Sequence, residues 1–311
     1  MISDHQAMWI AVQLANGNAF FFGSALIVAV AVWSMFRQRL NALSRVAYLL
    51  GIGFVSVSST PLPHFLYAIW AVGVIGFACA NSFSDGRFRR VTALSLILLT
   101  LIATAMEVPH LSEPGIVIDP GDTIYVIGDS ITAGVDDRKR EMTWPALLRN
   151  GRGLQVVDLS QAGATLSSAL NGQQPSIPSG QPAHSAVILE IGGNDLLGEV
   201  GAARFRSDLN KLLMAIRPKA HSIVMLELPL FPFHNDHGTA QRSLAKEYHV
   251  SLIPKRNFAD LIGTRAATLD GLHLSASGQM LMAELASKVI GSRTETSAER
   301  SPASATDAQP K

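Results

Sequence analysis

The sequence TIYVIGDSITAG (residues 123–134) contains a short apolar, β-branched run that stops abruptly at Gly128-Asp129-Ser130. Such a run is typical of a strand that is buried on both faces of a parallel sheet. In open α/β folds, ligands bind at the edge where the carboxyl ends of the strands meet. Ser130 would lie at that edge, so it is the candidate nucleophile.

Short apolar runs and helical patterns alternate downstream of this stretch. Strands are predicted at 123–127, 154–159, 186–191, 222–228 and 250–254, and helices at 144–150, 202–216, 239–248 and 275–290. Alternating strands and helices favour parallel pairing with helices on both faces. The predicted fold class is α/β, a three-layer α/β/α sandwich with a five-stranded parallel sheet of the flavodoxin-like kind.

Three further motifs follow the serine at positions suited to chemistry. Gly163 closes Ser160-Gln161-Ala162-Gly163 after the second strand, where a glycine lets a backbone N–H face a ligand without obstruction. Asn194, in Gly-Gly-Asn-Asp after the third strand, can present a side-chain N–H₂ to the same point. Near the carboxyl terminus, Asp270 precedes His273 by three residues, close enough to orient the imidazole ring.

These residue types meet the needs of acyl transfer. A serine hydroxyl is a poor nucleophile until a base takes its proton, and His273 can be that base if Asp270 holds its tautomer. The tetrahedral intermediate then carries negative charge. The backbone N–H groups of Ser130 and Gly163 and the Asn194 amide could stabilise it as a three-donor oxyanion hole.

In this order, the four motifs resemble the sequence blocks of the SGNH (GDSL) hydrolases over about residues 120–291. The spacing is similar to that of the bacterial thioesterase/lysophospholipase branch, whose members hydrolyse acyl esters and thioesters without a cofactor. The resemblance implies that Ser130 is the nucleophile, His273 the base and Asp270 its orienting partner. It also implies that Gly163 and Asn194 donate to the oxyanion.

Two positions depart from the family pattern. Asp158 stands where asparagine is common, and Leu274 follows the histidine where proline is common. Neither change removes a catalytic group, so both bear on substrate preference. Phe231 and Phe233 could line an acyl pocket, and burial in the core is an equal alternative.

The amino-terminal third is far more apolar than the rest. Four helices that could cross a membrane are predicted, at 19–36, 46–60, 64–80 and 91–106. Arginines mark two of the connecting loops, whereas the Pro61-Leu62-Pro63 turn has none: Arg37, Arg39 and Arg45 lie in one loop, and Arg87, Arg89 and Arg90 in the other. By the positive-inside rule, these loops face the cytoplasm and the downstream domain is extracytoplasmic.

Composition excludes several kinds of partner and site. The formal net charge is +1, without a basic stripe, so nucleic acid is not an expected partner. The single cysteine excludes an intramolecular disulfide and a cysteine-based metal site. His234 and His237 have no third ligand nearby, so a solvated loop is the expectation there and no metal is expected.

The sequence thus predicts the following organisation: a transmembrane region at 1–107, a linker at 108–122, a hydrolase domain at 123–291 and a disordered tail at 292–311. The leading hypothesis is a multi-pass protein of the cytoplasmic (inner) membrane that hydrolyses acyl or acetyl esters, with the bilayer as its other partner. The anchor is expected to contribute confinement alone. One alternative is O-acyl transfer to a sugar acceptor, and another is a non-enzymatic glycan- or lipid-binding domain.

Overall fold

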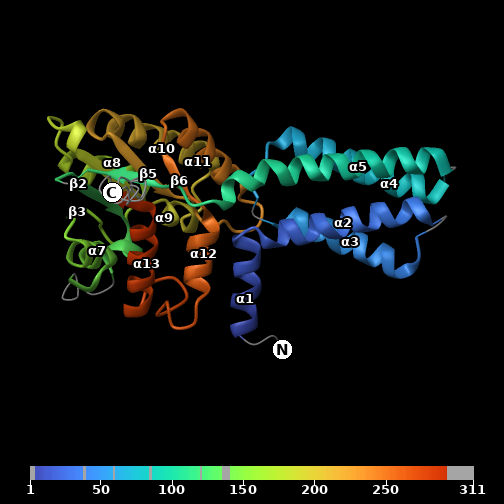
Figure 1. Ribbon diagram of the computed structural model, residues 1–311, viewed down its shortest axis with the longest axis horizontal. Helices are drawn as coiled ribbons and strands as arrows, with labels where there is room; N and C mark the ends of the chain where they lie inside the picture. The colour runs from blue at the N-terminus through green and yellow to red at the C-terminus, as the bar shows by residue number, and fades with distance from the viewer. Residues whose placement is uncertain are drawn as a thin grey trace, which may run out of the picture.

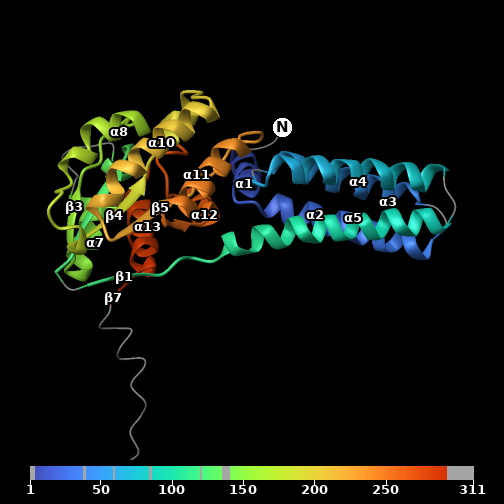
Figure 2. The ribbon, with the colours of Figure 1, turned by 90° about the horizontal axis from the view of Figure 1, so that it is seen from above.

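The computed structural model describes residues 4–292, except 38, 39, 59, 84, 85, 120 and 135–140. An α/β domain lies at one end of the molecule and an elongated helical bundle extends from it (Figure 1, Figure 2). Arg39 and all of the predicted tail beyond Ser292 lie outside the described residues.

The domain is built on the predicted five-stranded parallel sheet, in the order β3-β2-β4-β5-β6. Its strands are β2 (Thr123–Gly128), β3 (Gln155–Asp158), β4 (Ser185–Glu190), β5 (Ser222–Leu226) and β6 (Ser251–Ile253). Every neighbouring pair in this order is parallel. Because β2 pairs with both β3 and β4, the strand that carries Ser130 is flanked by the strands that carry the other two loops of the site.

Helices cover both faces of the sheet, which confirms the three layers. One face carries α8 (Leu166–Gly172), α10 (Ala202–Ile216) and α11 (Asn235–Glu247), and the other carries α7 (Trp144–Arg152), α12 (Lys255–Gly263) and α13 (Ala276–Val289). Side chains of β4 alternate between the two cores: Val187 and Leu189 join the first, Ala186 and Ile188 the second. Burial on both faces is most complete in the central strand β4, where every residue is buried, and it explains the apolar run that predicted this strand.

The bundle consists of α2 (Asn18–Phe36), α3 (Ala42–Val57), α4 (His64–Phe83) and α5 (Gly86–Glu107). By length and composition, three of its helices could cross a membrane, and α3 is a shorter apolar helix. Helices α2 and α3 approach closely at Gly23, where a Cβ atom would lie 2.7 Å from the carbonyl oxygen of Gly51. Such small-residue contacts are typical of helix pairs in membranes.

The segment predicted as a linker is partly ordered in secondary structure. It begins with a 3-10 turn (Val108–Leu111) and continues into β1 (Ile116–Ile118), which pairs in parallel with β7 (Ile290–Ser292). Ile116 and Ile290 are both buried in the core on the α13 side. The sequence did not indicate β1, because a three-residue strand between prolines and glycines gives no periodic signal, and the linker boundaries stay a prediction.

The amino-terminal helix α1 (Asp4–Ala15) packs against α12 of the α/β domain. Val12 meets Gly263, where an added Cβ atom would lie 2.7 Å from its Cγ2 atom. The amide of Asn16 donates to the Asp260 carboxylate at 2.9 Å, and Arg256 donates to the Asn18 side chain at 3.1 Å. Helix α1, which belongs to the segment predicted as transmembrane, thus packs on the surface of the α/β domain, while the expectation that this segment contributes confinement alone stays a prediction.

A buried ion cluster forms a second junction between bundle and domain. The Arg242 guanidinium on α11 donates two hydrogen bonds to Glu107, at the end of α5, over 2.6 and 2.9 Å. Its Nε donates to Glu227, after β5, over 2.6 Å. All three side chains are at most 9% exposed. The bidentate geometry satisfies the charges that burial would otherwise leave unpaired.

We expect the Arg242→Met substitution to lower the free energy of unfolding by about 3–5 kcal/mol, because it removes the guanidinium that bonds both buried carboxylates and leaves Lys255 as the nearby buried cation. Thermal unfolding in detergent measures this loss. The matched control is Arg204→Met, which removes an exposed partner of Asp208 and should cost at most about 1 kcal/mol. Equal shifts for the two variants would contradict a stabilising role for the cluster.

Candidate active site

Ser130 lies where the sequence placed it, at the carboxyl edge of the sheet. Strand β2 ends at Gly128, Asp129 caps the next helix, and Ser130 begins the short helix α6 (Ser130–Ala133). The cap is made by the Asp129 carboxylate, which accepts a hydrogen bond from the Ile131 N–H at 2.9 Å. Asp129 therefore holds the turn that carries Ser130.

The turn requires a glycine at position 128. A Cβ atom there would lie 2.5 Å from the Thr132 hydroxyl oxygen, which belongs to the helix that follows the strand. That hydroxyl is itself fixed, because it donates to Glu190 at 2.8 Å and accepts from the Trp144 indole N–H at 3.2 Å. Because Gly128 has no side chain, the helix that begins at Ser130 can pack directly against the end of β2.

Two glutamines hold the backbone on either side of the turn. Gln173 binds Gly128 twice, accepting from its N–H and donating to its carbonyl, both at 3.0 Å. Gln279, on α13, donates to the Ile131 carbonyl at 3.1 Å and accepts from the Trp144 N–H at 2.8 Å. Sequence reasoning missed both residues, because Gln173, directly after α8, and Gln279, within α13, bond to segments far away in the chain and neither has a local signature.

His273 and Asp270 form the predicted pair in the loop before α13. The ring Nδ1 of His273 lies 2.7 Å from the Asp270 Oδ2. The other carboxylate oxygen accepts from the backbone N–H groups of Leu272 and His273, at 3.0 and 2.8 Å. The ring contact, followed by these two backbone bonds, holds the pKa of Asp270 well below its usual range. Asp270 thus stays ionised, and it occupies the Nδ1 side of the His273 ring.

The oxyanion candidates lie on the loops after β3 and β4. Gly163 adopts a positive φ of 74°, which favours glycine. Asn194, in α9 (Gly193–Leu197), donates its side-chain N–H₂ to the Ala164 carbonyl at 2.9 Å and to the Asp129 carboxylate at 3.3 Å. These bonds join all three loops. Among the described residues, no hydrogen bond links the Ser130 hydroxyl to the His273 ring.

A second carboxylate lies behind the serine turn. Glu190, the last residue of β4, is fully buried beside Asp129. Burial raises the pKa of Asp129 to about 6, against the opposing hydrogen bond from Ile131. Burial and the charge of Asp129 likewise raise the pKa of Glu190 well above its usual range. The pair therefore carries a proton under mildly acidic conditions.

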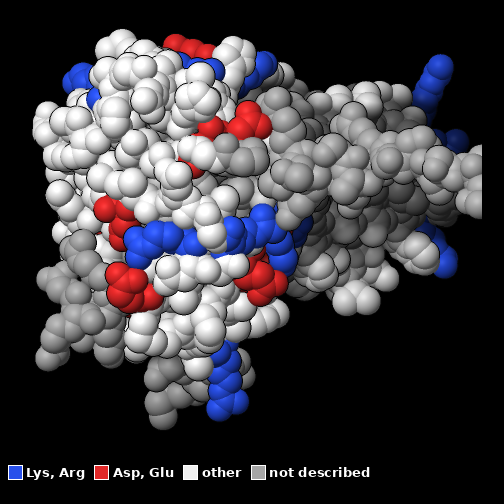
Figure 3. Space-filling model, turned by 60° about the vertical axis from the view of Figure 1, so that its left-hand side comes forward, with Lys and Arg blue, Asp and Glu red and all other residues white. Residues whose placement is uncertain are grey.

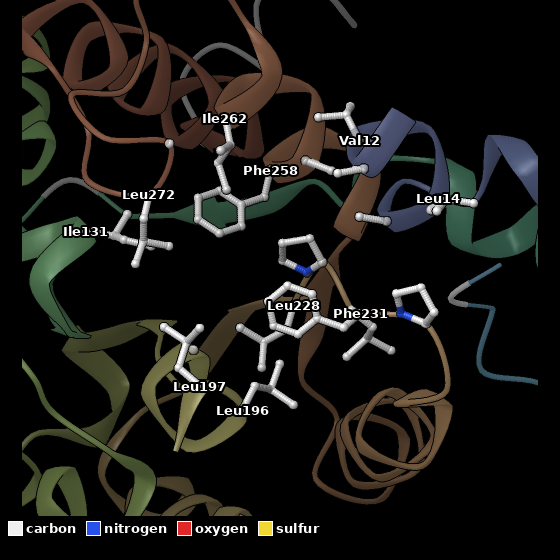
Figure 4. A pocket seen from close by; sticks show the side chains of 18 of the residues that line it. Val12, Leu14, Ile131, Leu196, Leu197, Leu228, Phe231, Phe258, Ile262 and Leu272 are labelled. Carbon is white, nitrogen blue, oxygen red and sulfur yellow. The ribbon is translucent and has the colours of Figure 1, made fainter. Parts of the chain in front are cut away.

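An apolar cavity of about 270 Å³ opens beside these residues (Figure 4). Its wall includes Ile131, Gly193 and Leu272, the chain neighbours of Ser130, Asn194 and His273. Phe231 also lines it, which favours the acyl-pocket alternative for that residue. Phe233 does not line it and is 79% exposed, so it belongs to neither the pocket nor the core.

Asp158 and His237, which the sequence analysis also considered, have structural roles. Asp158 accepts hydrogen bonds from the N–H and hydroxyl of Ser160, and so shapes the loop that carries Gly163. His237 is not in a solvated loop, because it is buried in α11 with its Nε2 2.8 Å from the Val200 carbonyl oxygen. Within the described ranges, no cluster of histidine, cysteine or acidic residues could hold a metal ion.

The fold and site define an α/β enzyme with a serine at the strand end. Residues 126–281, half of the chain, match the GDSL-like Lipase/Acylhydrolase family, and the protein belongs to that family of esterases and acylhydrolases. An arylesterase of Vibrio mimicus is 24% identical over 64% of this chain and 98% of its own length. The esterase TesA of Pseudomonas aeruginosa is 25% identical over 61% of this chain and 90% of its own length.

Among solved structures, a crystal structure of TesA is similar to the chain. It is 25% identical, covers 54% of this chain and 97% of its own, and superposes with a TM-score of 0.47. The matched family segment ends before residue 282 and begins after the bundle, so the helices α1 to α5 lie outside it.

We expect the carboxyl pair to make stability pH-dependent. The pKa of Asp129 is about 6 in the folded protein against an ordinary 3.8, so between these pH values the folded chain binds more protons than the unfolded chain. The free energy of unfolding of the native protein, relative to that of Asp129→Asn, should fall as pH rises through this window. Thermal unfolding midpoints of both chains at several pH values measure the difference.

The control for this experiment is Glu284→Gln, which removes a carboxylate that is 63% exposed. Its stability relative to the native protein should change little over the same window. A difference between native and Asp129→Asn chains that rises with pH would contradict the raised pKa.

Proposed function

We propose that the protein is a membrane-anchored serine ester hydrolase in which Ser130 is the nucleophile, His273 the base and Asp270 its orienting partner. The observation that carries this proposal is the Asp270–His273 pair, with its 2.7 Å contact, whose intervening residues Gly271 and Leu272 line the same apolar cavity as Ile131, the residue after Ser130. The base, its orienting carboxylate and the serine thus share one edge of the sheet.

The reaction proceeds in two acyl transfers. The Ser130 oxygen attacks the ester carbonyl carbon as its proton passes to the Nε2 of His273, and the bond from carbonyl carbon to alkoxide oxygen then breaks. His273 returns the proton to the departing alcohol. A water molecule then attacks the acyl-serine, gives its proton to His273, and releases the carboxylic acid as Ser130 regains its hydrogen.

Negative charge on the former carbonyl oxygen requires donors that are already in place. We assign the Ser130 and Gly163 N–H groups and the Asn194 amide to this role. The longer of the two Asn194 bonds, 3.3 Å to Asp129, is the one that an oxyanion would replace. Ala164 keeps the side chain in place through the 2.9 Å bond.

The outer surface of the bundle supports insertion in a bilayer. Large apolar side chains such as Phe22, Leu49, Val72 and Leu98 are each at least 56% exposed there, a pattern suited to lipid contact. The loops that carry Arg37 and Arg87 lie at the bundle end away from the α/β domain (Figure 1), and Figure 3 shows basic side chains at that end. This arrangement favours an extracytoplasmic α/β domain.

Labelling with a serine-directed fluorophosphonate tests the nucleophile. Ser130→Ala should abolish both labelling and ester hydrolysis, and His273→Ala should abolish turnover, because each removes a bond-making group. Asn194→Ala should lower kcat by about a hundredfold or more while leaving some activity. Ser167→Ala, on α8, is the control and should be labelled like the native chain. A label that persists in Ser130→Ala would disprove the assignment.

Reporter fusions test the topology. A reporter fused after Gly291 should be active only in a form that works outside the cytoplasm, because the arginine-marked loops are expected inside. The same reporter inserted after Arg37 is the control and should work only in the cytoplasmic form. The reverse pattern would place the α/β domain in the cytoplasm and exclude extracytoplasmic substrates.

A further inference from the structure

The apolar cavity beside the catalytic residues has walls from two distant parts of the chain. At one end it is lined by Ile131 and Leu272, next to Ser130 and His273. At the other end it is lined by α1, through Ala11, Val12, Leu14 and Ala15 (Figure 4). Helix α1 lies outside the family-matched segment, so this wall is an addition to the hydrolase domain.

The added wall is fixed in place. The contact between Val12 and Gly263 is so close that a Cβ atom at position 263 would force the valine or the backbone to shift. The bond from Asn16 to Asp260 holds the end of α1 against α12. A wall held by packing and a side-chain hydrogen bond gives the cavity a defined length, which a freely hinged helix would not.

The lining determines which chemistry the cavity can accept. Every lining side chain is apolar except that of Glu190, and Glu190 is turned to the Thr132 hydroxyl at 2.8 Å. Such a surface offers neither a counter-charge nor a row of donors for a sugar or a phosphate. It does match an unbranched hydrocarbon chain, whose carboxyl carbon would lie at Ser130.

We propose that the cavity binds the acyl chain of the ester substrate and that α1 limits the length of that chain. This inference rests on the proposed ester hydrolase function. A cavity of about 150 Å³ lined by leucine and phenylalanine holds a benzene ring, so about 270 Å³ accommodates roughly ten carbon atoms. The substrate class is therefore a medium-chain acyl ester, and α1 is a specificity element.

Chain-length profiles of kcat/KM on p-nitrophenyl esters, from acetate to palmitate, test this proposal. For the native chain, kcat/KM should rise about fourfold per methylene until the cavity is full, near decanoate. Ala15→Leu fills the α1 end, so it should lower kcat/KM for decanoate at least about tenfold and leave butanoate within about twofold. Leu14→Ala lengthens the cavity and should move the optimum to longer chains.

The matched control is Ile10→Phe, which adds bulk on α1 at a side chain that is 42% exposed and does not line the cavity. It should leave the profile unchanged. Fluorophosphonate labelling at the native rate checks that each variant is folded. The native kcat/KM is also measured on a decanoyl lysophospholipid in phosphatidylcholine vesicles. Comparison with the value for the soluble decanoate ester shows whether the enzyme prefers an acyl chain presented by lipid or one in solution.

The outcomes separate the two proposals. An active native enzyme whose profile is the same in Ala15→Leu, Leu14→Ala and Ile10→Phe would overturn the role of α1 and leave the hydrolase assignment intact. A native chain that is neither labelled nor active on any ester would overturn the proposed function itself. A profile that shifts only in the two cavity variants supports the specificity role of α1.

Discussion

Parallel hydrogen bonding of β2 with β3 and β4 is the interaction on which the candidate site depends. Because parallel strands point the same way, their carboxyl ends meet at one edge, and the loops with Ser130, Gly163 and Asn194 are forced together. Asn194 then joins those loops by binding Ala164 and Asp129. His273 reaches the same edge from a different direction, through the loop ahead of α13. The site is thus assembled by sheet topology first and by side-chain bonds second.

The junction with the helical bundle depends on a buried ion cluster and on side-chain packing instead of strand pairing. Arg242 is surrounded by Glu107 and Glu227 in an almost fully buried position, so the last bundle helix cannot leave the domain without exposing an ion pair or stranding a charge. Helix α1 adds an apolar contact at Val12 and Gly263. The α/β domain therefore meets the bundle through both charge pairing and packing. The apolar cavity beside the candidate site includes residues from the amino-terminal helix.

The sheet, its helical layers and the class of enzyme could be predicted from sequence because each has a local signature. Strand runs such as 124–127 and 186–189 contain no charged residue, since both faces are buried. The three-residue spacing of Asp270 and His273 lets the carboxylate reach the imidazole ring. Gln173, Gln279 and Glu190 could not be predicted, because their roles arise from contacts between residues far apart in the chain. The place of α1 was missed for the same reason: nothing local marks Val12 as the partner of Gly263.

The pairing of β1 with β7 has a consequence for the order in which the protein can form. β1 follows directly after the bundle, whereas β7 ends the last helix of the domain, so Ile116 and Ile290 meet only when nearly the whole domain has been synthesised. During synthesis, the bundle helices emerge first. β1 then stays unpaired until every strand of the main sheet and β7 have been made. Closing this late, long-range contact completes the domain beside the helical bundle, and its loop-closure entropy makes it slow relative to local helix formation.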